Sequence, residues 1–89
     1  MKFRDLKFRT WAESDAQARV EINGYDISIV RNSLSYGGGE GFYEMGIFKD
    51  DKMCDPLAWG DDVKGWLTPQ DVEQELELIE ALWNQTIHT

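Results

Sequence analysis

The sequence predicts an α+β fold: a small antiparallel β-sheet of about four to five strands with one C-terminal α-helix packed on one face. Two observations carry this prediction. Short β-rich segments bounded by turn residues fill the first two thirds of the chain, and Asn23-Gly24 between two of them is a strong hairpin signal. A stripe of apolar residues at helical spacing then runs through the last quarter.

Length and composition bound the domain organisation. The chain has 89 residues, 42% hydrophobic and 29% charged, which predicts one globular domain over residues 1–89 and excludes wholesale disorder. No apolar run approaches the roughly 18 residues of a membrane span. The charged start lacks the apolar segment of a signal peptide, and Cys54 has no second cysteine to pair with. These features predict a cytoplasmic protein.

The first strands are expected in the N-terminal third. Residues 6–11 fit a first strand, and residues 11–17 fit a turn or a helical turn. Residues 19–22 and 26–31 are rich in β-branched side chains and flank Asn23-Gly24, so they predict a hairpin.

The middle of the chain predicts a connection and two further strands. Residues 35–41 are rich in glycine and fit a flexible connection. Residues 42–49 form a strand with two distinct faces, residues 50–51 a turn, and residues 52–59 a last strand that Pro56 would place at an edge or a bulge. One face of the strand at 42–49 would carry Phe42, Glu44, Gly46 and Phe48.

The helix is predicted from about Pro69 to about Gln85. Thr68 fits the N-cap, Pro69 the first helical position, and Asp71 is an acid three residues after the cap. The apolar stripe consists of Val72, Leu76, Ile79 and Trp83.

Charge is distributed unevenly. The net charge is −8, and residues 55–89 alone hold eight acids against the single base Lys64. This distribution argues against direct binding to nucleic acid or to an anionic membrane, because both need clustered Lys and Arg. It permits binding to a basic protein surface. The alternative is that the negative charge only keeps a small protein soluble.

The predicted helix concentrates this acidity. Glu73, Glu77 and Glu80 share one stripe beside the apolar face, whereas Asp71 and Glu75 lie on the opposite flank. Five acids over about 13–14 Å of helix approach the charge spacing of a nucleic-acid strand. Asp61 and Asp62 would extend this track, or would cap a short helical turn. The stripe is therefore interpreted as a surface for a basic partner, or as a solvated helix face.

Residues for catalysis, metals and cofactors are scarce. His88 lies next to the C-terminal residue, and Cys54 has neither a CxxC partner nor an internal histidine to activate it. The glycines at 37–41 lack the GK[ST] ending of a phosphate-binding loop, and Asp50-Asp51 and Asp61-Asp62 do not fit an EF-hand. No catalytic residue, no metal ligand and no cofactor is therefore predicted.

Several motifs occur in an order that resembles a known group of proteins. These are Asn23-Gly24-Tyr25, Ser35-Tyr36-Gly37-Gly38, Gly41-x-Tyr43-Glu44-Met45 and Asp61-Asp62-Val63-x-Gly65-Trp66-Leu67-Thr68. Together they resemble a family of small uncharacterised bacteriophage proteins over roughly residues 22–75, while the first 20 residues have no counterpart. The resemblance implies a phage origin and carries no catalytic residue.

These observations favour a non-enzymatic phage protein that binds a basic, nucleic-acid-binding surface of a host protein and inhibits it by nucleic-acid mimicry, as an anti-CRISPR or other anti-defence protein does. Asp61, Asp62, Glu73, Glu77 and Glu80 would supply the charge, and Tyr36 and Trp66 the apolar anchors, unless Trp66 belongs to the core. The alternatives are a phage accessory or minor structural protein that self-associates through a sheet edge, as a homodimer for example, and a small-ligand binder using the glycine-rich loop.

Overall fold

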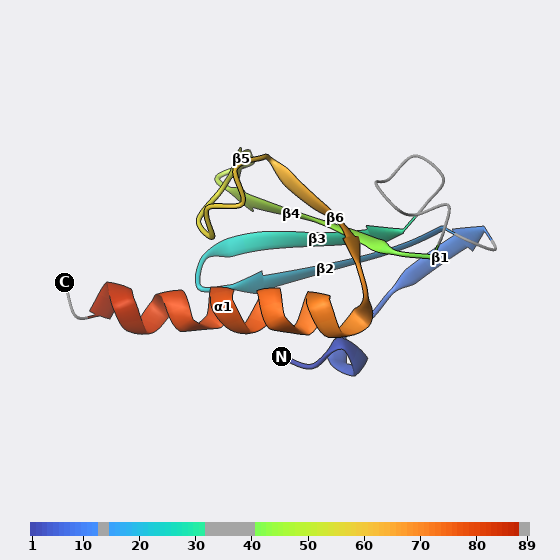
Figure 1. The fold of residues 1–89 in the computed structure, drawn as a ribbon, viewed down its shortest axis with the longest axis horizontal. Helices are drawn as coiled ribbons and strands as arrows, with labels where there is room; N and C mark the ends of the chain where they lie inside the picture. The colour runs from blue at the N-terminus through green and yellow to red at the C-terminus, as the bar shows by residue number, and fades with distance from the viewer. Residues whose placement is uncertain (13–14, 32–40, 88–89) are drawn as a thin grey trace.

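The computed structural model confirms the predicted fold class, an antiparallel sheet with one C-terminal helix packed against it (Figure 1). It describes residues 1–12, 15–31 and 41–87, with the backbone alone for residues 11–12 and 83–87. In chain order the elements are a 3₁₀ turn η1 (Phe3–Asp5), β1 (Arg9–Ala12), β2 (Asp15–Ile22), β3 (Tyr25–Arg31), β4 (Tyr43–Lys49), β5 (Lys52–Cys54), β6 (Val63–Leu67) and α1 (Pro69–Ile87).

The sheet follows the order β1-β2-β3-β4-β5, and every pairing is antiparallel. β6 also pairs with β4, so β5 and β6 share one side of that strand and lie end to end along it. The helix α1 runs along one face of the sheet, and η1 lies against the helix (Figure 1). The other face of the sheet has no helix over it in the described parts of the chain.

The predicted hairpin is confirmed. Ile22 pairs with Tyr25, and Asn23 and Gly24 between them have φ values of 55° and 82°. Two successive positive φ values are typical of a type I′ turn, which Asn-Gly favours. The Asn23 side-chain amide also donates to the backbone carbonyls of Ile79 and Glu80, at 2.8 and 3.0 Å, so this turn is fastened to α1.

The core lies between the sheet and α1. Val72, Leu76 and Ile79 of the predicted apolar stripe are fully buried, whereas the side chain of Trp83 lies outside the described residues. From the sheet and the N-terminal segment the core receives Leu6, Ala18, Ile27, Ile29, Met45, Ile47 and Leu67. Each additional Å² of apolar surface removed from water contributes about 25 cal/mol, so this single layer provides most of the driving force for folding.

The start of α1 is a capping box, as the sequence predicts. The Asp71 backbone N–H donates to Thr68 Oγ1 at 3.1 Å, and the Thr68 backbone N–H donates to Asp71 Oδ2 at 3.0 Å. These reciprocal bonds satisfy amide groups that have no partner within the helix. Hydrogen bonding of the Asp71 carboxyl to the Thr68 backbone, and to a smaller extent to the Thr68 side chain, holds the pKa of that carboxyl below its usual value of 3.8.

Replacing Thr68 with Ala removes the cap hydroxyl, and we expect it to lower the free energy of unfolding by about 0.5–2 kcal/mol. Chemical denaturation of the two proteins at pH 7 measures this difference. Replacing the exposed Gln70 with Ala is a suitable control, because it leaves both capping bonds intact. Equal losses of stability in the two variants would contradict the capping role.

The lowered pKa of Asp71 also predicts a pH dependence. The carboxylate favours the folded state at pH values above the ordinary pKa, and this contribution is lost as the pH falls through the lower pKa of the folded protein. The stability of wild type relative to Asp71→Asn should therefore decline below about pH 4. Urea denaturation of both proteins between pH 2 and 7 tests this, and a constant difference would contradict it.

Three details of the strand prediction are wrong. Residues 15–17 belong to β2 rather than to a turn, and the strand expected over residues 52–59 stops at Cys54. Asp55 ends it, because its carboxylate accepts the backbone N–H groups of Trp59 and Gly60 at 2.6 and 2.8 Å and folds the chain into a loop. The sequence also does not predict β6, so the described sheet has six strands where about four to five are predicted.

Candidate protein-binding surface

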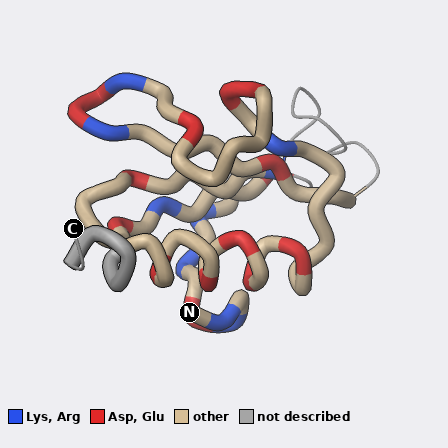
Figure 2. Tube along the Cα trace, turned by 60° about the vertical axis from the view of Figure 1, so that its left-hand side comes forward, with Lys and Arg blue, Asp and Glu red and all other residues tan. Residues whose placement is uncertain are grey.

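The acidic stripe of α1, formed by Glu73, Glu77 and Glu80, lies beside the chain's own N-terminal segment (Figure 2). Glu73 Oε1 accepts the backbone N–H of Phe3 at 2.6 Å. Glu80 forms an ion pair with the N-terminal ammonium group of Met1. Glu77 is exposed to solvent. Two of the three carboxylates therefore have intramolecular partners, which accounts for part of the acidity without another molecule.

Glu75 is the buried acid of the helix. The sequence places it with Asp71 on the flank opposite the acidic stripe, and only 7% of its surface is exposed. Its carboxylate forms an ion pair with Lys64 of β6 and accepts a hydrogen bond from Trp59 Nε1 at 3.3 Å. A buried carboxylate needs such partners, because removing its charge from water is costly. Lys64, the single base among residues 55–89, is thus paired with an acid of the same chain.

The remaining predicted site residues lie elsewhere. Asp61 and Asp62 are exposed in the loop before β6, and they precede a strand rather than a helical turn. Trp66 projects from β6 and is exposed. Tyr36, most of the glycine-rich connection and His88 lie outside the described residues. The structure therefore separates the predicted site into the stripe on α1 and a group formed by Asp61, Asp62 and Trp66.

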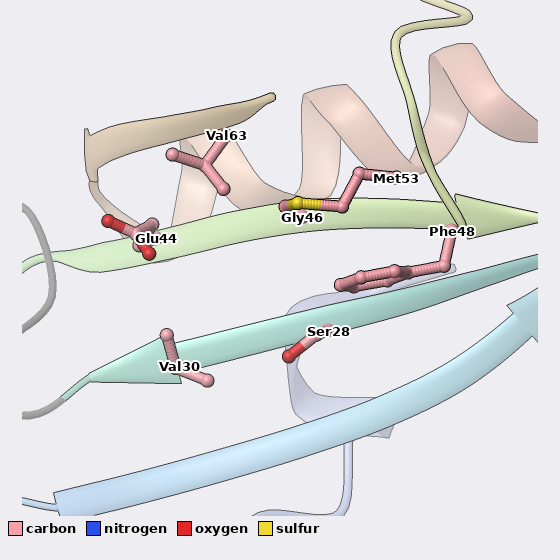
Figure 3. A pocket seen from close by; sticks show the side chains of 7 residues that line it. All are labelled: Ser28, Val30, Glu44, Gly46, Phe48, Met53 and Val63. Carbon is pink, nitrogen blue, oxygen red and sulfur yellow. The ribbon is translucent and has the colours of Figure 1, made fainter. Parts of the chain in front are cut away.

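This second group adjoins the face of the sheet that α1 leaves uncovered, which we call the open face. The alternation predicted for β4 is confirmed, because Met45 and Ile47 are buried beneath α1 while Glu44, Gly46 and Phe48 line a hollow on the opposite side (Figure 3). The open face is defined by Ser28, Val30, Phe42, Glu44, Gly46, Phe48, Met53, Val63 and Trp66. Seven of these nine residues have apolar side chains or none, which is unusual for a solvent-facing sheet surface.

Trp66 is the most conspicuous residue of the open face. Its side chain is 55% exposed, and its ring contacts Phe42 with the centroids 5.7 Å apart. Its backbone has φ of 58°, in the left-handed region. This conformation comes from a β-bulge, in which Gly65 and Trp66 stand opposite the single residue Glu44. A bulky side chain in that region costs about 1–2 kcal/mol, so the fold holds an aromatic ring in solvent at a loss of stability.

The centre of the open face is hollowed. Ser28, Val30, Glu44, Gly46, Phe48, Met53 and Val63 line an open hollow of about 210 Å³ (Figure 3). Gly46 forms its floor, and the side chains of Phe48, Met53 and Val63 stand around it. Arg19 lies over the Phe48 ring, 5.7 Å from its centroid, on the β2 side. The hollow therefore lies on the same face as the exposed Trp66 ring and its half-buried neighbour Phe42.

Residues for covalent or metal chemistry are few in the described structure. Residues 1–12, 15–31 and 41–87 contain no cluster of three or more His, Cys, Asp or Glu side chains placed to bind a metal. Within the same ranges, α1 and η1 lack the length and apolar character needed to cross a bilayer. Cys54 is half-buried, and its thiol donates to the carbonyl of Ile47 at 3.6 Å.

Cys54 is expected to react slowly with alkylating reagents. Burial raises the pKa of its thiol; Lys49 opposes part of this increase, and Asp55 adds a smaller one. The thiolate is the reactive form, so the alkylation rate at pH 8 should be lower in the folded protein than in the urea-unfolded protein. Iodoacetamide kinetics between pH 7 and 10 measure this rate. Equal rates in the two states would contradict it.

Comparison of the chain with protein-family models, with curated proteins and with solved structures gives no match. The resemblance to small bacteriophage proteins therefore stays a prediction from the motifs alone, and the surface must be interpreted from its own geometry.

Proposed function

We propose that this protein is a non-enzymatic binding module that engages a basic partner protein through the open face and the adjoining Asp61 and Asp62. The observation that carries the proposal is Trp66, an exposed aromatic ring held in a left-handed backbone conformation on an apolar surface. Backbone strain of this kind persists only where the surrounding structure enforces it, and such residues cluster at functional sites. Tryptophan is also enriched among the residues that contribute most to binding energy in protein interfaces.

Charge favours a basic partner over a second copy of the chain. Each copy of the chain carries a net charge of −8, so two copies would repel each other on approach. The sheet edges also favour self-association little: β1 has four residues and a bulge, β5 has three residues, and β6 has a bulge. A positively charged protein would instead be attracted to the acidic loop and would meet apolar anchors beside it.

The proposal keeps the type of function predicted from the sequence and moves the binding surface. Inhibition of a host protein by occupancy, in the manner of an anti-CRISPR protein, is one specific form of it. Nucleic-acid mimicry by the α1 stripe receives less support, since Glu73 and Glu80 already have partners in the N-terminal segment. The two surfaces lie on opposite sides of the sheet, so variants can separate them.

To test the proposal, the protein is immobilised through its C-terminus and incubated with a lysate of the cells that naturally produce it, at 50 and 500 mM salt. Proteins captured at low salt are identified, purified and titrated against four variants. We expect Trp66→Ala to weaken binding by about 30-fold, the effect of losing a hot-spot aromatic of about 2 kcal/mol. Asp61→Asn/Asp62→Asn should slow association and reduce its salt dependence.

Two matched controls complete the test. Glu77→Gln/Glu80→Gln removes the same number of charges from the helix, and Leu78→Ala removes an equally exposed apolar side chain, 53% against 55% for Trp66. Both should bind within about 2-fold of wild type, as surface changes outside an interface do. Loss of binding in the helix variant alone would support the α1 stripe instead. The absence of any captured protein that depends on Trp66 would overturn the proposal.

A further inference from the structure

Gly46 is the residue of the open face whose identity the fold explains least. It lies in the middle of β4, paired with Ser28 on one side and Val63 on the other. Glycine weakens a strand interior, because it has no side chain to pack and loses more conformational freedom on folding. Its φ is not in the positive range that favours glycine, unlike those of Gly24, Gly41 and Gly60.

Neighbouring atoms do not require glycine at this position either. A Cβ at residue 46 would lie 3.5 Å from Phe48 Cε2, 3.6 Å from Val63 Cγ1 and 3.7 Å from Met53 Cε. These are ordinary van der Waals distances, so alanine would fit and would improve the packing of the open face. What glycine provides is the hollow itself, which a side chain at position 46 would begin to fill (Figure 3).

The hollow has the size and lining of a pocket for one side chain. Its volume of about 210 Å³ compares with the roughly 150 Å³ of an apolar protein cavity that holds a benzene molecule. Val30, Phe48, Met53 and Val63 make its walls apolar. It is open to solvent, and Trp66 of β6 and Phe42, directly before β4, continue the apolar surface beyond it. An aliphatic side chain would lose most of its contact with water there.

The charged groups around the hollow differ between its two sides. On the β6 side, the exposed Asp61 and Asp62 directly precede Val63 of the lining. On the β2 side, Arg19 lies over the Phe48 ring. A segment bound in the hollow would therefore meet negative charge where it continues toward β6. A bound segment with Lys or Arg next to the inserted side chain would be attracted to that side, in agreement with the net charge of −8.

We propose that the hollow floored by Gly46 receives one aliphatic side chain of the partner protein, flanked in the partner's sequence by Lys or Arg. This inference rests on the proposed function and specifies the chemistry that the open face selects. A glycine at this position then serves recognition, since the fold itself would accept alanine.

Three synthetic peptides with blocked ends test the inference: Lys-Lys-Leu-Lys-Lys, Lys-Lys-Ala-Lys-Lys and Asp-Asp-Leu-Asp-Asp. Each is titrated into ¹⁵N-labelled protein while the backbone amide signals are followed by NMR. The lysine-flanked leucine peptide should shift the signals of Ser28, Gly46 and Val63, with an apparent affinity at least 5-fold above that of the alanine peptide, because one buried leucine side chain separates them. The aspartate-flanked peptide should produce no saturable shift at these positions.

The same titration on Gly46→Ala should show at least a 5-fold loss of affinity for the leucine peptide. The thermal unfolding midpoint of this variant should equal or exceed that of wild type, because the added methyl group meets no clash. Leu78→Ala on α1 is the matched control and should bind the peptide as wild type does.

Equal binding of the leucine and alanine peptides, or of the lysine- and aspartate-flanked peptides, would overturn the inference. Unchanged peptide binding by Gly46→Ala would do the same. These failures are distinguishable from failure of the proposed function. A captured protein whose binding depends on Trp66 but is indifferent to Gly46→Ala leaves the binding module standing and removes only the role of the hollow.

Discussion

Replacing Leu76 with Ala should lower the free energy of unfolding by about 2–5 kcal/mol. Leu76 is fully buried at the centre of the layer between α1 and the sheet, so truncation removes apolar contacts and leaves a cavity. Small domains are stable by only about 5–15 kcal/mol, and this single change would consume a large part of that margin. Urea denaturation monitored by tryptophan fluorescence measures the loss.

Leu78 provides the matched control for Leu76, since the same substitution two residues later removes the same atoms from an exposed position. Leu78→Ala should change stability by no more than about 0.5 kcal/mol. Equal losses in the two variants would mean that α1 does not present Val72, Leu76 and Ile79 to the sheet, and the described packing would be wrong.

Replacing Trp66 with Gly should weaken partner binding by about 30-fold while sparing the fold. Glycine adopts the left-handed conformation at position 66 without steric cost, so the substitution relieves about 1–2 kcal/mol of backbone strain. The lost contact with Phe42 offsets this by about 0.5–1.5 kcal/mol. The net stability should therefore remain close to that of wild type, although a large aromatic side chain has been removed.

Trp66→Ala separates the two contributions. Alanine loses the contact with Phe42 and keeps the strained backbone, so it should be less stable than Trp66→Gly by about 1 kcal/mol. Both variants should bind the partner about 30-fold more weakly than wild type. Thermal unfolding and titration of each variant give the two quantities independently. A glycine variant less stable than the alanine variant would show that the bulge does not strain residue 66.

The fold class was predictable because its main signals are local. Asn23-Gly24 dictates a turn with two positive φ values, and the spacing of Val72, Leu76 and Ile79 dictates a helix with one buried face. The capping box at Thr68 and Asp71 fixes where that helix begins. Each of these features depends on residues no more than seven positions apart, so the sequence alone reveals it.

Features that depend on distant residues were not predictable in the same way. Lys64 and Glu75 are eleven positions apart, and only the approach of β6 to α1 brings the exposed lysine to the buried carboxylate. The strand β6 contains a β-bulge at Gly65 and Trp66, which interrupts the alternation of its side chains between the two faces of the sheet. A helical wheel likewise cannot show that the N-terminal segment returns to Glu73 and Glu80.

The open face was predictable only in part. The sequence shows the alternation of Phe42, Glu44, Gly46 and Phe48, but the binding site was predicted on the helix and no role was predicted for this face. A usable signal was present, because a single helix covers only one face of a sheet. An apolar row on the second face then has no helix over it in the described residues, which favours the proposal that this face binds another molecule.

The position of α1 after all six strands has a consequence for biosynthesis. Translation delivers every strand before the helix that shields them, so the apolar side chains of Ile27, Ile29 and Met45 stay uncovered while the nascent chain is still short. The polypeptide can close its interior only after Ile79 has left the ribosomal exit tunnel. Chains stalled earlier should engage chaperones, and release of the last helical turns should trigger folding in one late cooperative event.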